Sequence, residues 1–404
     1  MGKDLDLSDR RKAYLGITLL GIVSLLGDIV YEGSRGIVPD YLKFLGATAL
    51  VVGLMGGLGD FLGYTLRLLS GFLVDVTNAY WLFIFVGYGL IASIPLLGIS
   101  TGIEVAILLV LVERVGKGLR APSRDTVVSV VAKDIGTGRG FGIHEFLDQI
   151  GAIAGPALVV AIMFYSANRY SVTFALLGVP FLALLLFLVY TYRKIGPQTT
   201  VVDLKKTEKR TFRFSRPFYT YILAVALNAI GLVPYTLILF KAAAILDPVQ
   251  QQWGVPLFYV LIQGVDAPAA LLSGFAFDRF GLKMLILPFV LSVFPPLLIM
   301  VGSDLVVLAA ASAIFGFILG TQESIYRAAV SELTPLSSRG TAYGIFNTVY
   351  GLGLLISGAV YGFIIDYKIP LTFTAFFTLL MQIPATALLL SVGSEKADKQ
   401  GSKQ

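Results

Sequence analysis

Two short stretches of sequence decide the architecture of this chain. Residues 70–75 read SGFLVD and residues 273–278 read SGFAFD, so one S-G-F-x-x-D pattern returns after 203 positions. Further residues match at an offset of 202: Gly142, Ile143 and Gly151 with Gly344, Ile345 and Gly353. Two matches at nearly the same offset predict a duplicated chain, in which the second half repeats the first.

The composition places both halves in a membrane. Of the 404 residues, 56% are apolar and 14% are charged, and the mean hydropathy is +0.82. Ordinary soluble domains carry about 25% charged residues. We therefore exclude a soluble globular enzyme, a disordered chain and a nucleic-acid-binding domain. Because the chain has no cysteine and a single histidine, His144, thiolate and multi-histidine metal centres are excluded, and we expect no resident metal or cofactor. The carboxylates keep a hard metal cation open as a substrate.

Apolar stretches of about 20 residues, the length that crosses a bilayer core, recur along the whole chain. They predict an all-α integral membrane protein with twelve transmembrane helices, and they lack the short alternating segments of a β-barrel. The first stretch follows a basic cluster without a cleavage site, so we expect a retained first helix. The predicted spans are residues 13–38, 47–73, 80–100, 103–130, 140–165, 170–192, 217–244, 253–277, 281–302, 304–330, 340–365 and 369–391.

The longest polar segment divides six predicted helices from six. The predicted parts are a first bundle (1–192), a basic linker (193–216) that could also lie against anionic lipid headgroups, a second bundle (217–393) and a tail (394–404). With the N-terminus inside, 21 Lys and Arg residues fall in inner segments and four in outer loops. Positive charge is retained on the cytoplasmic side. We therefore predict that both termini are cytoplasmic, in the plasma membrane.

Four motifs make the chain resemble the major facilitator superfamily. Residues 274–283, GFAFDRFGLK, look like its loop motif G-x-x-x-D-R-x-G-x-K/R, and residues 71–78 keep the Gly and Asp of that motif without its basic residues. Residues 114–118, RVGKG, are similar to R-x-x-Q-G. Residues 151–156, GAIAGP, resemble G-x-x-x-G-P, which is associated with proton-coupled antiporters that export solutes.

The resemblance implies two six-helix bundles around an axis normal to the membrane, with a site between them near mid-depth. It also implies roles for residues of the motifs. Carboxylate–guanidinium contacts at the loop motif can hold neighbouring helices together in one state and break in the other. The expected gate residues are Asp75, Asp278, Arg279 and Lys283, and the expected helix-5 motif is Gly151, Gly155 and Pro156.

Ionisable residues inside a bilayer are costly and mark functional positions. Asp28, Glu32 and Arg35 follow i, i+4, i+7 and so share one helix face. A basic stripe, defined as Arg114, Lys117, Arg120 and Arg124, runs along the fourth predicted helix. The substrate or proton candidates are Asp28, Glu32, Arg35, Glu113, Arg114, Lys117, Arg120, His144, Glu145, Asp148 and Asp266.

Two interpretations of these charges stay open. In one, the basic stripe and the carboxylates of the fifth helix, Glu145 and Asp148, form buried salt bridges at one level. In the other, a cation at mid-depth binds an anionic group and a buried carboxylate carries protons. We favour the second for Asp28, Glu32 and Arg114. Other residues have the following expected roles: Glu113 faces a different neighbour, His144 shuttles protons or only hydrogen-bonds, Asp266 closes the site, and glycines with Pro39 break or kink the outer end of helix 1.

These features predict a secondary transporter that moves a small solute by alternating access, coupled to protons, with efflux favoured. Uptake of an anionic solute is the alternative, as is a non-transporting sensor or scramblase. The expected partners are a small-molecule substrate, protons and the lipid bilayer, without nucleic acid, and the chain is expected to be a monomer. No nucleotide-binding loop or nucleophile elbow occurs in the sequence, so we do not expect an enzyme.

Overall fold

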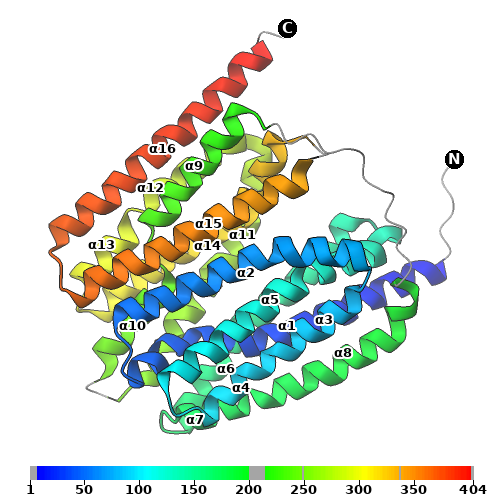
Figure 1. Ribbon diagram of the computed structural model, residues 1–404, viewed down its shortest axis with the longest axis horizontal. Helices are drawn as coiled ribbons and strands as arrows, with labels where there is room; N and C mark the ends of the chain where they lie inside the picture. Colours follow the sequence, from blue (N-terminus) through cyan, green and yellow to red (C-terminus); the bar gives the residue numbers. More distant parts are fainter. Residues whose placement is uncertain (1–6, 200–213, 248–249, 336–337, 402–404) are drawn as a thin grey trace. The chain divides into compact units, whose positions relative to one another are not determined.

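The computed structural model describes residues 7–199, 214–247, 250–335 and 338–401, and the described residues form helices without any strand (Figure 1). The first elements are α1 (Leu7–Phe44), α2 (Ala49–Thr77), α3 (Tyr80–Gly89), η1 (Leu90–Ala92), α4 (Ser93–Leu96), η2 (Leu97–Ile99), α5 (Ile103–Val131), η3 (Ala132–Asp134), α6 (Thr137–Tyr165), α7 (Tyr170–Leu176) and α8 (Gly178–Thr199). The later elements are α9 (Arg216–Gly231), α10 (Tyr235–Leu246), η5 (Gln252–Gly254), α11 (Val255–Phe280), η6 (Gly281–Leu285), α12 (Ile286–Leu291), α13 (Phe294–Val301), α14 (Leu305–Leu333), α15 (Arg339–Asp366) and α16 (Leu371–Gly401).

Ten stretches of the described residues are long and apolar enough to cross a bilayer. The helix α5, 29 residues long, is not among them because charged residues interrupt its apolar sequence. The stretch Gln252–Val301 is one of these ten, and it has 50 residues. A helix of that length would be longer than twice the thickness of a bilayer core of about 30 Å, so this stretch is long enough for two crossings. The all-helical membrane fold is therefore confirmed, whereas the number twelve and the cytoplasmic termini stay predictions.

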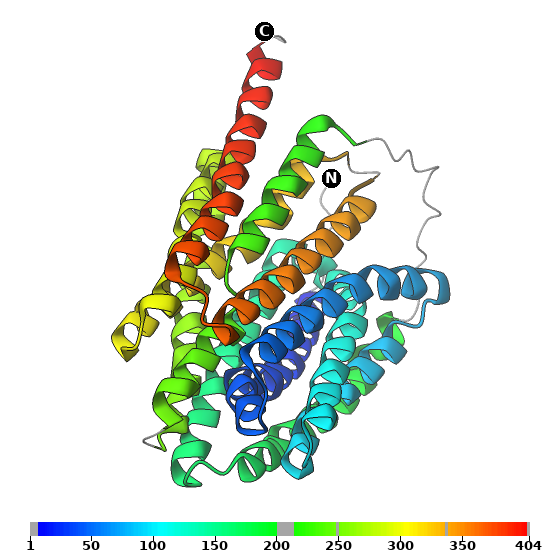
Figure 2. The same ribbon diagram turned by 60° about the vertical axis from the view of Figure 1, so that its left-hand side comes forward.

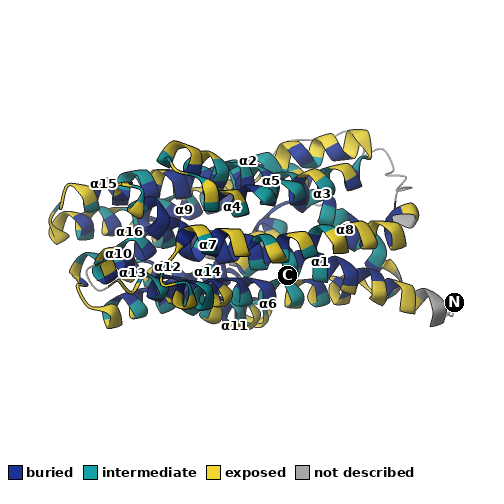
Figure 3. Cartoon of the chain, turned by 90° about the horizontal axis from the view of Figure 1, so that it is seen from below, coloured by how far each residue is buried: buried dark blue, intermediate teal, exposed yellow. Residues whose placement is uncertain are grey.

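Large apolar side chains line the outer faces of the helices. On α8, Val179, Leu182 and Leu186 are exposed at helical spacing, and Figure 3 shows exposed positions alternating with buried ones along the helices. A soluble protein rarely exposes contiguous apolar patches of this kind. These faces suit contact with lipid.

The chain clusters into two compact units. The first unit contains residues 1–37 and 62–206, and the second contains residues 38–61 and 207–404. The end of α1 and the start of α2 therefore pack with the second-half helices. The helix α8 continues to Thr199, beyond the predicted start of the linker, and α16 continues to Gly401, beyond the predicted end of the second bundle. Residues 200–213 of the predicted linker lie outside the described residues.

Hydrogen bonds join residues at equivalent positions of the two halves. In the first unit, the Ser70 hydroxyl donates to the carbonyl oxygen of Gly118 at 2.7 Å and joins α2 to α5. In the second unit, the hydroxyls of Ser273 and Thr321 lie 3.0 Å apart and join α11 to α14. Each residue of the second pair lies 203 positions after its counterpart. This shared contact supports the duplication that the sequence predicts.

Both copies of the loop motif contain a residue with positive φ directly after the helix. Asn78 follows α2 with φ 54°, and Gly281, 203 positions later, follows α11 with φ 57°. Glycine adopts positive φ without strain, and asparagine tolerates it better than most residues. The first-half copy of the motif therefore also has a positive-φ position, although it lacks the basic residues.

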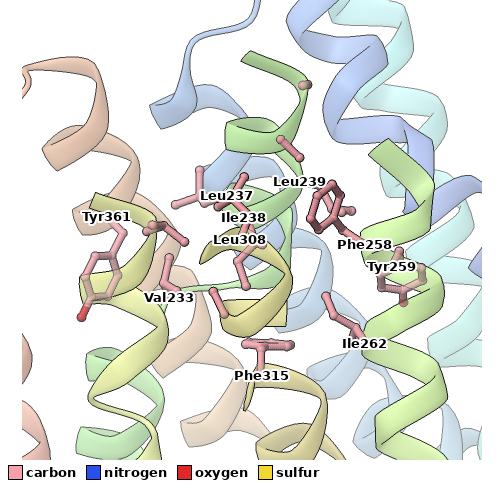
Figure 4. Packing of buried hydrophobic residues seen from close by; sticks show 14 of the residues in the cluster. Val233, Leu237, Ile238, Leu239, Phe258, Tyr259, Ile262, Leu308, Phe315 and Tyr361 are labelled. Carbon is pink, nitrogen blue, oxygen red and sulfur yellow. The ribbon is translucent and has the colours of Figure 1, made fainter. Parts of the chain in front are cut away.

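The core of the second unit surrounds an interruption in a helix. Residues 232–234 separate α9 from α10, and the side chains around this break include Val233, Leu237, Phe315 and Tyr361 (Figure 4). The Tyr361 hydroxyl donates to the carbonyl oxygen of Gly231 at 2.7 Å, and the hydroxyl of Ser357 donates to the next carbonyl oxygen. These bonds satisfy backbone groups that the interrupted helix leaves open. In Figures 1 and 2, α16 lies along α9, and α14 is paired with α11.

The outer end of helix 1 is expected to be broken or kinked, and the break is wrong, because α1 runs without interruption through Pro39; a kink there stays a prediction. Its glycines serve close packing instead. A Cβ atom on Gly33 would lie 3.0 Å from the carbonyl oxygen of Gly155 on α6. A side chain at Gly33 would therefore push the two helices apart.

Candidate functional site

A buried carboxylate shared by two cations lies in the first unit. Glu32 Oε1 accepts a hydrogen bond from Arg35 Nη1 at 2.7 Å and lies 3.6 Å from Lys117 Nζ of α5. Glu32 is 4% exposed, whereas the side chains of Arg35 and Lys117 are 15% and 23% exposed. The polar face of α1 and the basic stripe of α5 thus meet at Glu32. We call Glu32, Arg35 and Lys117 the shared-carboxylate cluster.

Tyr31, which the sequence analysis did not select, lies among the cations of this cluster. Its ring centroid is 4.6 Å from Lys117 Nζ, 4.9 Å from Arg120 Cζ and 5.3 Å from Arg35 Cζ. Cations over an aromatic face are attracted by its quadrupole. The Tyr31 side chain is also hydrogen-bonded to Asp28, one turn earlier on α1. Tyr31 therefore links Asp28 of α1 to the basic stripe.

Arg120 is paired within its own helix. Its Nη2 lies 3.4 Å from Glu113 Oε1, its Nη1 donates to the carbonyl oxygen of Gly87 at 3.3 Å, and its guanidinium lies over the ring of Tyr88 at 5.1 Å. Glu113 Oε2 is also 3.8 Å from Arg114 Nε. Glu113 thus pairs with residues of α5 itself, because position i+7 returns to the same face of a helix.

A second group of polar side chains gathers around Arg124. Its Nη2 lies 3.0 Å from Asp125 Oδ1, and its Nη1 lies 3.6 Å from Asp148 Oδ2 of α6. Arg124 Nη1 also donates to Ser24 Oγ of α1 at 3.2 Å, and this hydroxyl lies 3.0 Å from His144 Nε2. Ser24, like Tyr31, did not stand out in the sequence.

The expectation that Glu145 joins Asp148 in buried salt bridges is wrong. Glu145 is exposed and accepts a hydrogen bond from Gln149 of its own helix at 3.4 Å. Residues three apart point about 60° away from each other on a helix. Asp148 consequently faces Arg124 while Glu145 faces outward.

The helix-5 motif, named after the fifth predicted span, lies on α6 of the structure. It brings α6 against α1 at the level of Asp28. A Cβ atom on Gly151 would lie 2.6 Å from the carbonyl oxygen of Leu25 and 2.8 Å from Asp28 Cβ. A Cβ atom on Gly155 would lie 2.6 Å from the carbonyl oxygen of Ile29. Glycine at these positions, ahead of Pro156, therefore permits the close approach of the two helices.

The predicted gate residues lie at the ends of α2 and α11. Asp75 is exposed at the end of α2, and Asp278 lines a cavity of about 370 Å³ between α11 and α14. The Arg279 guanidinium lies 5.4 Å from the ring centroid of Phe280, and Lys283 is exposed in η6. Their role in gating stays a prediction.

Asp266 is buried in the second unit, where α11 meets α14. A Cβ atom on Gly320 would lie 2.7 Å from Asp266 Oδ1. Gln263, one turn earlier on α11, is buried as well. Among the described residues, no three His, Asp or Glu side chains gather where they could hold a metal ion.

The second unit also contains a neutral polar network that sequence reasoning missed. Asn228 of α9 donates from Nδ2 to Gln382 Oε1 at 2.7 Å, and its Oδ1 accepts from Gln322 Nε2 at 3.1 Å and from the Tyr326 hydroxyl at 2.9 Å. The Tyr350 hydroxyl donates to Gln322 Oε1 at 2.9 Å. Uncharged polar residues within apolar stretches were the available signal, because buried polar groups need hydrogen-bond partners.

Comparison with known proteins agrees with this architecture. The profile of the Major Facilitator Superfamily matches residues 225–404. An uncharacterized protein of Mycobacterium tuberculosis is 34% identical over 363 residues, which cover 88% of each chain. An uncharacterized MFS-type transporter of Methanocaldococcus jannaschii is 26% identical over 393 residues, 95% of this chain and 96% of that protein.

Solved structures of transporters share the fold. The nucleoside transporter NupG matches with a TM-score of 0.71 at 14% identity, covering 94% of this chain and 99% of the other. A peptide transporter, POT, matches with a TM-score of 0.70 at 16% identity, covering 93% of each chain. With the sequence relatives and the family profile, this similarity leads to one assignment: the chain belongs to the major facilitator superfamily and is a membrane transporter, not an enzyme.

Proposed function

We propose that the protein is a proton-coupled secondary transporter that works by alternating access, exports its solute, and uses the shared-carboxylate cluster as its coupling site. The observation that carries this proposal is the position of Glu32, a buried carboxylate held between Arg35 and Lys117. Ionisable groups at such depth are costly and are associated with ion and proton pathways.

Protonation of Glu32 would change the charge of the cluster by one unit. In its ionised form, Glu32 Oε1 faces both cations at 2.7 and 3.6 Å. A proton on this carboxyl group removes the negative charge while Arg35 and Lys117 stay positive in a poorly solvated site, where charge interactions are strong. The uncompensated positive charge then favours a change in the conformation of the bundle, or the binding of an anionic ligand, when a proton binds.

The direction of efflux rests on the helix-5 motif. Its glycines place α6 directly against α1 beside Asp28, so a movement of α6 would reach the carboxylates of α1. In an exchange of this kind, the proton enters the cell as the solute leaves. The plasma-membrane location and the monomeric state belong to the same proposal.

Uptake of an anionic solute is the second candidate, and a specific observation favours it. Arg35 and Lys117 are each partly exposed while Glu32 is buried, so a carboxylate or phosphate group could replace Glu32 at these cations once Glu32 is protonated. Proton and anion would then move in the same direction.

Flux in proteoliposomes tests both candidates. Purified protein is reconstituted with a pH-sensitive dye inside, and a panel of labelled organic anions, sugars, drugs and divalent metals is assayed under inward and outward pH gradients. Opposed fluxes of proton and solute support efflux by antiport, whereas joint accumulation of protons and an anion supports uptake. Initial rates that ignore the gradient for every transported solute would sink proton coupling.

A matched pair of variants locates the coupling site. Glu32→Gln keeps the shape of the side chain and removes its charge, so we expect solute exchange to continue while the pH gradient loses its effect. Glu104→Gln is the control, because Glu104 is exposed in the first turn of α5. Full proton dependence in Glu32→Gln would remove Glu32 from the coupling mechanism.

A further inference from the structure

A single serine joins four helices of the first unit. Ser24 Oγ on α1 lies 2.9 Å from the Tyr88 hydroxyl of α3, 3.0 Å from His144 Nε2 of α6 and 3.2 Å from Arg124 Nη1 of α5. Ser24, Tyr88 and His144 are all buried. We call Ser24, Tyr88, His144 and Arg124 the serine junction.

The number of protons at the junction restricts its hydrogen bonds. A serine hydroxyl has one proton to donate and two lone pairs that accept. The Arg124 guanidinium can only donate, so it occupies one lone pair of Ser24. The remaining lone pair and the hydroxyl proton must serve Tyr88 and His144, one each. Only two arrangements satisfy all three contacts.

The two arrangements differ in what they demand of Tyr88. In the first, Tyr88 donates to Ser24 and Ser24 donates to His144 Nε2. In the second, His144 Nε2 donates to Ser24 and Ser24 donates to Tyr88, so the Tyr88 proton needs another acceptor. Within the described part of the chain, Ser24 is the one hydrogen-bond partner of that buried hydroxyl. A buried donor without an acceptor is costly, so the first arrangement is preferred.

The first arrangement fixes where His144 carries its proton. Because Nε2 accepts from Ser24, the neutral imidazole must be protonated on Nδ1. A proton on Nδ1 leaves no buried donor unsatisfied. In the described part of the chain, the fully buried side-chain atoms without a hydrogen-bond partner do not include His144 Nδ1.

The charged surroundings of His144 come from the helices packed around it. They are Arg124 and Asp125 of α5 and Asp148 of its own helix, with Tyr88 on α3 and Asp28 one turn from Ser24 on α1. Arg124 already forms ion pairs with Asp125 at 3.0 Å and with Asp148 at 3.6 Å. If Nε2 were protonated, it could no longer accept from Ser24, so the Ser24 hydroxyl would have to donate to Tyr88 instead. The Tyr88 hydroxyl would then have no acceptor for its own proton.

We propose that Ser24 is a positioning residue that holds His144 as the neutral Nδ1–H tautomer and keeps protons off Nε2 while α1, α3 and α6 are packed together. Nε2 then becomes available when α1 separates from α6 or α3. The tautomer follows from the geometry alone, and only its link to transport rests on the proposed proton coupling. The step is a single proton transfer: an O–H bond of a hydronium ion breaks, an N–H bond forms at Nε2, a water molecule is left and the imidazole becomes a cation.

Because His144 is the only histidine, one isotope label tests the proposal. The full-length protein carrying ¹⁵N-histidine is reconstituted in lipid bilayers, and its ring nitrogen shifts are recorded by solid-state NMR across a pH series. We expect the Nδ1–H tautomer to exceed the Nε2–H tautomer about tenfold or more. A dominant Nε2–H signal in the wild-type protein would overturn the assignment.

Variants separate the role of Ser24 from a general effect on folding. Ser24→Ala removes the donor to Nε2, so we expect mixed tautomers and a protonation midpoint at higher pH. Ser24→Thr retains the hydroxyl and should restore the wild-type spectrum. Tyr88→Phe leaves Ser24 in place but removes the donor to its second lone pair. His144 Nε2 can then donate to that lone pair, so the Nε2–H tautomer should gain population. This variant tests the proposal even if Ser24→Ala does not fold.

Unchanged spectra in both Ser24→Ala and Tyr88→Phe would refute the positioning role. The measurement needs neither a substrate nor a gradient. A confirmed tautomer in a protein whose flux ignores pH would therefore disprove proton coupling and leave the assignment of His144 standing.

Discussion

Replacing Arg120 tests how the buried charges of α5 contribute to stability. The Arg120 side chain is 3% exposed, and its guanidinium contacts Glu113 at 3.4 Å and the carbonyl oxygen of Gly87 at 3.3 Å. It also lies over the rings of Tyr31 and Tyr88 at 4.9 and 5.1 Å. Arg120→Met retains much of the length of the side chain and removes every one of these polar contacts.

The expected loss is set by the charge that remains behind. Removing one partner of a buried ion pair costs about 3–5 kcal/mol, chiefly because the other charge stays buried. Desolvated cation–π contacts add up to about 2 kcal/mol each. Arg114 lies 3.8 Å from Glu113 and offsets part of the deficit. We therefore expect Arg120→Met to lower the free energy of unfolding by about 3 kcal/mol.

A double-mutant cycle separates the stranded charge from lost packing. Arg120→Met combined with Glu113→Gln removes both charges, so it should recover about 1–3 kcal/mol relative to Arg120→Met alone. Reversible unfolding by SDS titration in mixed micelles, followed by circular dichroism, gives each value. Arg169→Met is the control, because Arg169 is exposed before α7 and its loss should stay within about 0.5 kcal/mol. A loss below about 1 kcal/mol for Arg120→Met, or a double variant no more stable than the single one, would refute this reasoning.

Three further predictions concern stability and can be measured by the same titration. The Asp366 carboxylate accepts two backbone N–H groups at the start of α2, each at 2.8 Å, so Asp366→Ala should cost about 1 kcal/mol; no loss would mean that this cap is unimportant. Ser70→Ala and Ser273→Ala should each cost about 1 kcal/mol, and a difference above about 2 kcal/mol would contradict their equivalence. A Cβ atom on Gly57 would lie 2.6 Å from the backbone of α15, whereas one on Gly264 meets nothing within 4 Å. Gly57→Ala should therefore lose at least about 1 kcal/mol and Gly264→Ala almost none, and equal losses would argue against close packing at Gly57.

The architecture could be predicted because its signals are periodic. Apolar stretches of bilayer length and a repeat offset of 203 residues do not depend on knowing which side chains touch. The faces of α1 and α5 could likewise be predicted from helical spacing, and the structure brings Glu32 to Lys117. What spacing cannot show is the rotation of one helix against its neighbour. That rotation turns Glu145 outward and Asp148 toward Arg124.

The neutral members of the site could not be predicted in the same way. Tyr31, Tyr88 and Ser24 occur in apolar stretches where aromatic and small residues are ordinary packing residues, so nothing in their type marks them. Their importance arises from distances between different helices, such as the 2.9 Å between Ser24 and Tyr88. The interruption at residues 232–234 is different, since a glycine followed closely by Pro234 is a visible helix-breaking signal.

The two halves have different structures at equivalent positions of their first helices. At an offset of 203, Asp28 and Glu32 of α1 correspond to Gly231 and Tyr235, which border the break between α9 and α10. The first half keeps a continuous helix with charged side chains on it, whereas in the second half the helix is interrupted and leaves buried backbone carbonyl groups without partners in the helix. Side-chain hydroxyls such as that of Tyr361 then satisfy these carbonyls. Backbone carbonyls do not gain or lose protons near neutral pH, but carboxylates do. At these equivalent positions, therefore, only the first half has groups that can carry a proton, and changes at Tyr361 should alter stability without altering the response to pH.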